Sequence, residues 1–111
     1  PHDPEIVAHT ARIGAECGAD IVKTLYTGDI DSFKKVTESI PVPVVIAGGP
    51  KSKTDLDILQ MTEDAMDAGA KGVTYGRNIF AHKSPDKLVD ALAGIIFRKE
   101  SAKEMAKKLD N

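Results

Sequence analysis

The sequence is poor in cysteine and in long apolar runs, and it has no marked excess of charge. Its single cysteine, Cys17, cannot form an internal disulfide and fits the reducing environment of the cytoplasm. No apolar run approaches the roughly 20 residues that a membrane-spanning helix needs. The formal net charge of -2 provides no basic surface, so nucleic acid is not an expected partner. We therefore expect a cytoplasmic protein without a membrane or nucleic-acid partner.

Helical and strand patterns alternate along the 111 residues. Apolar positions at helical spacing, Ile6, Ile13 and Cys17, predict a first helix over residues 5–17, and Leu56 is a candidate core residue of a later helix. The other expected elements are strands at 21–25, 43–47 and 72–75 and helices at 31–39, 54–68, 85–97 and 101–109. Apolar strands that alternate with helices indicate a parallel sheet.

Three strands are too few for an open sheet with helices on both faces. They are a natural fraction of a (β/α)8 barrel, which typically needs about 250 residues. The predicted fold is therefore α/β, the C-terminal portion of such a barrel with about its last three strands, and residues 1–111 are expected to form a single unit. The lack of an initiator methionine fits a piece of a longer protein.

Glycines directly follow the second and third predicted strands. Gly48 and Gly49 come after the second strand, and Gly76 with Arg77 after the third. Glycines let backbone N–H groups approach a ligand closely, and a guanidinium suits phosphate oxygens. Either pair alone is more often an ordinary tight turn. Both pairs after consecutive strands favour a phosphate site, because barrels often hold phosphate after their last two strands.

Lys23 lies in the first predicted strand, among apolar residues. One interpretation is a strand lysine whose stem is buried and whose amine reaches solvent. The other is an amine inside a barrel that is kept neutral by desolvation and a nearby cation, and so can attack a substrate carbonyl to form a Schiff base. From periodicity alone the two interpretations are equally good.

Three motifs, GADIVKTLYTGD, VPVVIAGGPK and GAKGVTYGRNIF, resemble the closing third of the archaeal-type class I aldolases. That family includes fructose-bisphosphate aldolase and 2-amino-3,7-dideoxy-D-threo-hept-6-ulosonate synthase. The resemblance implies that Lys23 is the Schiff-base lysine and that the substrate is a phosphorylated sugar. It implies that Gly48, Gly49, Gly76 and Arg77 bind its phosphate. It also implies a homo-oligomer, commonly a decamer.

The resemblance leaves two activities open. The first is cleavage of fructose 1,6-bisphosphate to glycerone phosphate and glyceraldehyde 3-phosphate, and the second is the transaldolase-type reaction of the synthase. A non-catalytic phosphate-binding barrel fragment, or a barrel isomerase in which Lys23 only contacts the ligand, is the alternative from another class.

The family takes a tyrosine acid/base and an aspartate from earlier strands, so we expect these 111 residues alone to be inactive. Tyr26 and Tyr75 do not occupy that position. No metal or other cofactor is expected, since the histidines, His2, His9 and His82, lack the spacing of metal ligands.

Overall fold

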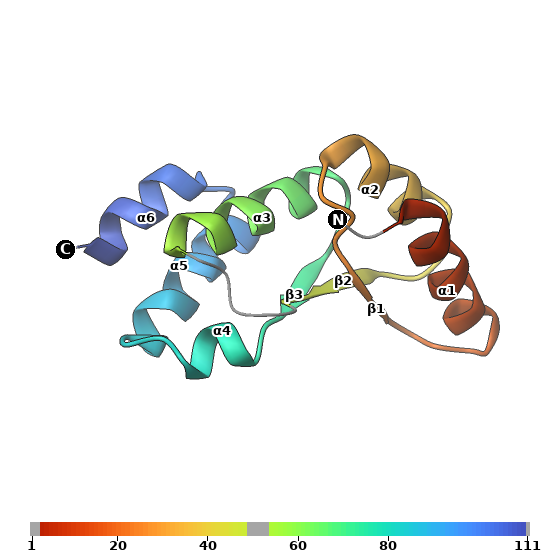
Figure 1. The fold of residues 1–111 in the computed structure, drawn as a ribbon, viewed down its shortest axis with the longest axis horizontal. Helices are drawn as coiled ribbons and strands as arrows, with labels where there is room; N and C mark the ends of the chain where they lie inside the picture. The colour runs from red at the N-terminus through yellow and green to blue at the C-terminus, as the bar shows by residue number, and fades with distance from the viewer. Residues whose placement is uncertain (1–2, 49–53, 111) are drawn as a thin grey trace. The chain divides into compact units, whose positions relative to one another are not determined.

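The computed structural model describes residues 3–48 and 54–110, and its elements follow the predicted alternation (Figure 1). Their order is α1 (Pro4–Glu16), β1 (Val22–Leu25), α2 (Ile30–Glu38), β2 (Val44–Ala47), α3 (Asp55–Asp67), β3 (Gly72–Thr74), α4 (Arg77–Phe80), α5 (Pro85–Arg98) and α6 (Ala102–Asp110). The short helix α4 is the one element that the sequence patterns did not predict. In the described part of the chain, no helix is long and apolar enough to span a membrane.

The chain divides into two compact units, each described here by itself. The sheet unit comprises Pro1–Ala47 and Asp64–Thr74, and it contains α1, α2 and all three strands. The helical unit comprises Gly48–Glu63 and Tyr75–Asn111, and it contains α4, α5 and α6. Helix α3 contributes its first residues to the helical unit and its last to the sheet unit.

The strands of the sheet unit form a parallel sheet in the order β1-β2-β3. Lys23 is in register with Val45, and Val45 with Gly72. The parallel pairing is the one that the sequence predicted. Among the described residues, β1 and β3 pair only with β2, so each leaves an open edge.

The two faces of this sheet differ in burial. Val22, Val44 and Ile46 are buried on one face, and α1 packs against β1. Lys23 and Leu25, on the alternate positions of β1, are exposed. Helices cover the outside of a barrel and its strands fill the inside, so the uncovered face corresponds to a barrel interior.

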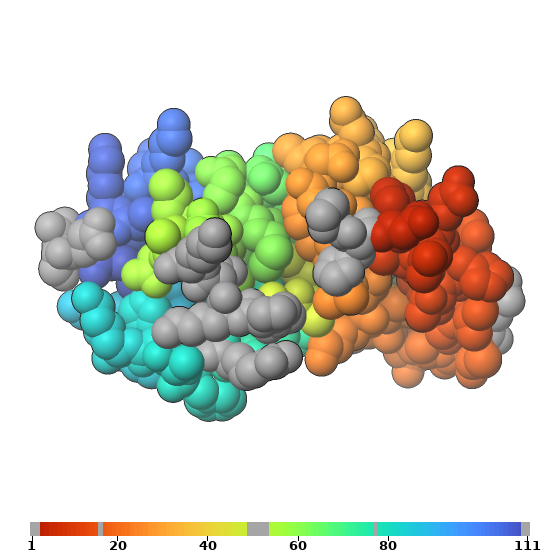
Figure 2. Space-filling view, viewed as in Figure 1, coloured from red at the N-terminus to blue at the C-terminus, as the bar shows by residue number. Residues whose placement is uncertain are grey.

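Local sequence signals explain where the helices of the sheet unit begin. Asp3 accepts a hydrogen bond from the Glu5 amide at 2.9 Å and caps α1, and Asp29 accepts one from the Ser32 amide at 2.8 Å and caps α2. Helices α1 and α2 lie side by side (Figure 2). Phe33 on α2 is fully buried.

A glycine ends α3 where the chain turns toward β3. Gly69 has a φ of 105°, which residues with a side chain rarely adopt, and an added Cβ would lie 2.7 Å from Thr37 Oγ1. The Thr37 hydroxyl donates to the Ala68 carbonyl at 2.6 Å. This bond ties α2 to the turn that positions β3.

In the helical unit, α6 packs on α5 through small and flexible residues. Met105 is buried, and its sulfur would lie 2.8 Å from a Cβ added at Gly94. The carboxylate of Glu63 accepts the Ala102 amide at 2.8 Å and so caps α6 from α3. The glycine therefore leaves the space in which Met105 sits.

The prediction of Leu56 as a core residue is wrong, and three apolar residues at helical spacing in the first predicted helix are exposed as well. Ile6 is 65% exposed, Ile13 and Leu56 are also exposed, and so is Cys17. Helix α1 buries its smaller residues instead, Val7 and Ala11. Helical spacing identifies an apolar stripe but not which edge of that stripe meets the neighbouring elements.

Candidate active site

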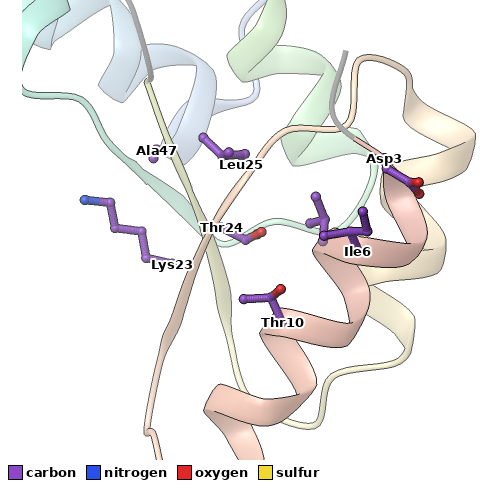
Figure 3. A pocket seen from close by; sticks show the side chains of 8 residues that line it. Asp3, Ile6, Thr10, Lys23, Thr24, Leu25 and Ala47 are labelled. Carbon is purple, nitrogen blue, oxygen red and sulfur yellow. The ribbon is translucent and has the colours of Figure 1, made fainter.

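Lys23 extends from the second residue of β1, on the uncovered face of the sheet. Its side chain points away from α1, whereas that of Thr24 points toward it (Figure 3). Lys23 itself is exposed. The expectation of a desolvated amine is therefore not met by these residues alone, although the lysine does lie on the face that a barrel would enclose.

A hollow of about 610 Å³ opens beside β1 in the sheet unit. It is lined from α1 and the residue before it, from β1 and from the end of β2, by Asp3, Ile6, Val7, Thr10, Lys23, Thr24, Leu25 and Ala47. Lys23 has no hydrogen-bond or ion-pair partner within residues 3–48 and 54–110. Its amine is thus accessible and is not held by a carboxylate there.

The helical unit brings together the residues that follow β2 and β3. A Cβ added at Gly48 would lie 2.9 Å from Asn78 Nδ2 and 3.0 Å from Tyr75 Cδ1. A Cβ added at Gly76 would meet nothing within 4 Å. The two predicted glycine loops therefore touch at Gly48, while Gly76 faces open space.

The other two predicted phosphate residues are less fully described. Arg77 is the first residue of α4, and Gly49 lies outside the described residues. The Gly76 carbonyl accepts the amides of Ile79 and Phe80 at 3.1 Å and 3.0 Å, which fixes the start of α4 directly after Gly76.

Tyr75 anchors the loop after β3 to α3. The Thr62 hydroxyl donates to the Ile58 carbonyl at 2.8 Å, so the Tyr75 hydroxyl, 2.8 Å from Thr62 Oγ1, is the donor of that bond. Burial raises the pKa of Tyr75 above its usual range, with a smaller opposing effect from the bond to Thr62. This phenol is a structural anchor and stays protonated at neutral pH.

Tyr26 directly follows β1, and its ring packs edge-on against Phe33 with centroids 5.2 Å apart. Burial, followed by the charges of Asp64 and Asp29, raises the pKa of Tyr26 to about 12. At neutral pH this phenol is also protonated.

One polar pair was not predicted. His82 Nε2 lies 2.9 Å from Asp55 Oδ1, and His82 Nδ1 accepts the Ser84 amide at 2.8 Å. The sequence separation of 27 residues gives no local signal for such a contact. Within the described residues, no group of three or more His, Cys, Asp or Glu side chains could hold a metal ion.

The sequence pattern of the DeoC/LacD family aldolases matches residues 1–82. The chain belongs to this family. It is 42% identical over 96 residues to the 2-amino-4,5-dihydroxy-6-oxo-7-(phosphonooxy)heptanoate synthase of Streptomyces griseus, a match that covers 86% of the chain and 35% of the synthase.

Two solved aldolase structures are also similar to most of this DeoC/LacD family member. An archaeal fructose 1,6-bisphosphate aldolase matches 86% of the chain with a TM-score of 0.83 and 42% identity, and a Schiff-base-forming fructose-1,6-bisphosphate aldolase matches 85% with a TM-score of 0.82 and 43% identity. The chain covers 38% of each. The prediction of a partial (β/α)8 barrel from a Schiff-base aldolase family is confirmed.

Proposed function

We propose that the protein containing this chain is a class I aldolase of phosphorylated ketoses, with Lys23 as its nucleophile. The likeness to Schiff-base-forming aldolases supports this most strongly. The exposed, unpaired amine of Lys23 on the uncovered sheet face supports it independently, because an amine bound to a carboxylate would be held in its charged, unreactive form. The favoured substrate is fructose 1,6-bisphosphate, cleaved to glycerone phosphate and glyceraldehyde 3-phosphate.

The proposed reaction uses the amine as an electron sink. The neutral Nζ of Lys23 adds to the ketone carbon C2, and loss of water gives an iminium ion. The electrons of the C3–C4 bond move into the iminium while the C4 hydroxyl loses its proton, which releases the aldehyde and leaves an enamine. Protonation of the enamine at C3 and hydrolysis of the resulting iminium return the free amine and release glycerone phosphate.

Phosphate binding in this proposal belongs to Gly48, Gly49, Gly76 and Arg77. Backbone amides beside glycines can approach the phosphate closely, and a guanidinium donates two parallel hydrogen bonds to its oxygens. The open space around Gly76 supports this role. Proton transfer is assigned to residues other than these 111, since neither Tyr26 nor Tyr75 occupies the position of the family's acid/base tyrosine.

A second candidate is a transaldolase-type synthase, which transfers a ketose-derived fragment to an amino-acid aldehyde. The 42% identity to a synthase whose name describes an aminated, phosphorylated keto acid favours it. Both reactions use the same lysine and phosphate loops. Product analysis separates them: the purified protein is given glycerone phosphate as the donor, with glyceraldehyde 3-phosphate as the acceptor in one reaction and aspartate semialdehyde in another.

The pathway, location and assembly in this proposal follow from these activities. The aldolase serves glycolysis and gluconeogenesis, and the synthase serves aromatic amino-acid biosynthesis. We further propose a cytoplasmic homo-oligomer, a decamer, which sedimentation of the naturally expressed protein would measure.

Borohydride trapping tests the proposed nucleophile. The naturally expressed protein is incubated with dihydroxyacetone phosphate and reduced, which converts the iminium to a stable secondary amine. Because trypsin does not cleave after a modified lysine, the adduct is expected on an uncleaved peptide of residues 13–34. An adduct on any other lysine, or none, would overturn the assignment of Lys23.

A further inference from the structure

The face of the sheet that carries Lys23 presents two rows of side chains. Residues in register on neighbouring parallel strands share a face, and every second residue of a strand returns to that face. The first row consists of Lys23, Val45 and Gly72. The second row, nearer the carboxyl ends of the strands, consists of Leu25, Ala47 and Thr74. Both rows belong to the sheet unit.

Two contacts support this assignment of faces. A Cβ added at Gly72 would lie 3.7 Å from Val45 Cγ1, so these two positions face the same side of the sheet. A Cβ added at Gly14 of α1 would lie 3.8 Å from Val22 Cγ2. Val22 therefore faces α1, and the next residue of the strand, Lys23, faces the opposite side.

Ala47 has the smallest side chain of the second row and lies between the two larger ones. Leu25 on β1 and Thr74 on β3 flank it, and both are exposed. The Thr74 hydroxyl donates to the Ile46 carbonyl at 3.3 Å, which restrains the threonine side chain. The second row thus has a notch at Ala47, bounded by Leu25 and Thr74.

The notch and the amine of Lys23 open into the same hollow. Lys23, Leu25 and Ala47 all line the hollow of about 610 Å³ beside β1. In Figure 3 the amine of Lys23 and the side chain of Ala47 lie on the side of β1 away from α1. Active sites of (β/α)8 barrels lie at the carboxyl ends of the strands. A ketone that enters from that end must pass the second row to reach the amine.

We propose that Ala47 is a specificity-determining residue that leaves the space in which the substrate's carbon chain lies while its ketone carbon is bonded to Lys23. The inference rests on the proposed function, since it takes Lys23 to be the nucleophile. A ketone carbon carries a carbon substituent on each side, so its adduct with the amine needs room on both sides of the new bond. A larger side chain at position 47 would exclude the ketone and leave the amine itself reactive.

The first test is borohydride trapping with dihydroxyacetone and, separately, with its phosphate, which share one carbon chain. In the naturally expressed protein, Ala47→Val and Ala47→Leu should raise the half-saturating concentration for the Lys23 adduct roughly tenfold or more with both ketones, because the added carbon atoms overpack the site. Ala47→Ser adds only an oxygen atom and should stay within about twofold of the wild type. Ala8→Leu, at another partly buried alanine of the sheet unit, is the matched control and should not alter trapping.

The second test uses formaldehyde to separate a loss of space from a displaced amine. Formaldehyde has a single carbon, and its imine with lysine is reduced by cyanoborohydride to a methylated amine. Methylation of Lys23, measured by mass spectrometry of tryptic peptides, should proceed at the same rate in the wild type and in Ala47→Leu. A merely structural role for Ala47, in which the substitution moves β1, would slow methylation and ketone trapping together.

The outcomes are distinct. A Lys23 adduct that forms equally well in the wild type and in Ala47→Leu, or that declines in parallel with methylation, would overturn the inference and retain the aldolase proposal. Absence of a Lys23 adduct in the wild type with both dihydroxyacetone and its phosphate would overturn both. If Ala47→Leu fails to fold, Ala47→Val decides the result, since valine is well suited to a strand.

Discussion

The sheet unit and the helical unit hold their proposed functional residues in different ways. In the sheet unit, Lys23 is placed by the backbone pairing of β1 with β2 and by burial of its neighbour Val22, and its amine has no partner in the described part of the chain. In the helical unit, side-chain hydrogen bonds surround the glycine loops, such as that between Thr62 and Tyr75.

The difference follows from what each residue has to do. A nucleophilic amine reacts only when it is neutral and unpaired, so a firm side-chain partner would inhibit it. A glycine has no side chain by which it can be held, so its position depends on the residues that touch it. The sheet therefore positions Lys23 through the backbone, whereas neighbouring side chains position Gly48.

Replacement of the proposed nucleophile should produce the largest difference between the effects of the two units on activity. Lys23→Met removes the amine but keeps a long apolar stem, so we expect the cleavage rate to fall by about a thousandfold or more. Phosphate affinity should change less than about twofold, because the residues proposed to bind phosphate lie in the other unit. Steady-state kinetics and calorimetry measure the two effects, and Lys71→Met, at another exposed lysine of the sheet unit, is the matched control.

Arg77→Ala should have the next largest effect, on binding alone. Loss of a charge-assisted bond to phosphate should weaken binding of a phosphorylated ketose about 10- to 100-fold. Binding of an unphosphorylated ketose should be unchanged, and Arg12→Ala, on the exposed face of α1, should alter neither. Equal losses for both ketoses would argue against a phosphate contact by Arg77.

Substitution by alanine should have different effects at Gly48 and at Gly76, the two loop glycines that the structure describes. Gly48→Ala places Cβ 2.9 Å from Asn78 Nδ2 and should destabilise the protein by about 1–2 kcal/mol through overpacking. Gly76→Ala meets nothing within 4 Å, so it should leave the melting temperature unchanged and weaken phosphate binding only. Thermal unfolding and calorimetry distinguish the two, and a loss of stability in Gly76→Ala would contradict this account.

Much of the sheet unit could be predicted from sequence because its order depends on local patterns. The strand Val44–Ala47 lies within the predicted segment, since its apolar run marks it as buried. Lys23 was correctly placed on a strand for the same reason. Whether its amine is buried or reaches solvent was left open, because burial on the inner face of a barrel depends on strands that lie elsewhere in sequence.

The helices α5 and α6 of the helical unit could also be predicted, but the contacts between its segments could not, because they join residues far apart in sequence. Helix α6 reads as a polar terminal segment, yet Met105 is buried in the space that Gly94 leaves. The pairing of His82 with Asp55 has no periodic signal, since it joins a loop to the start of a helix. Apolar spacing reports which face of an element is buried, but it does not identify the partner of a polar side chain.

The weakest expected effect concerns the start of α2, where the sheet unit does rely on a polar side chain. The Ser32 amide and hydroxyl donate to the carboxylate of Asp29, each at 2.8 Å, and these bonds, the amide's first, hold the pKa of Asp29 below its ordinary value of 3.8. The folded state therefore favours the ionised form, so the stabilisation is complete above the unfolded-state pKa and is lost as the pH falls through the lower, folded-state value.

Asp29→Ala should lower the melting temperature slightly at pH 7, and the difference from wild type should shrink as the pH falls below about 3.8. Calorimetric melting curves across this range measure it, with Asp29→Asn, which retains an acceptor for the amide, as the control. A difference that is constant with pH would mean that the charge of Asp29 contributes nothing, and that the sheet unit depends on backbone pairing and apolar packing even here.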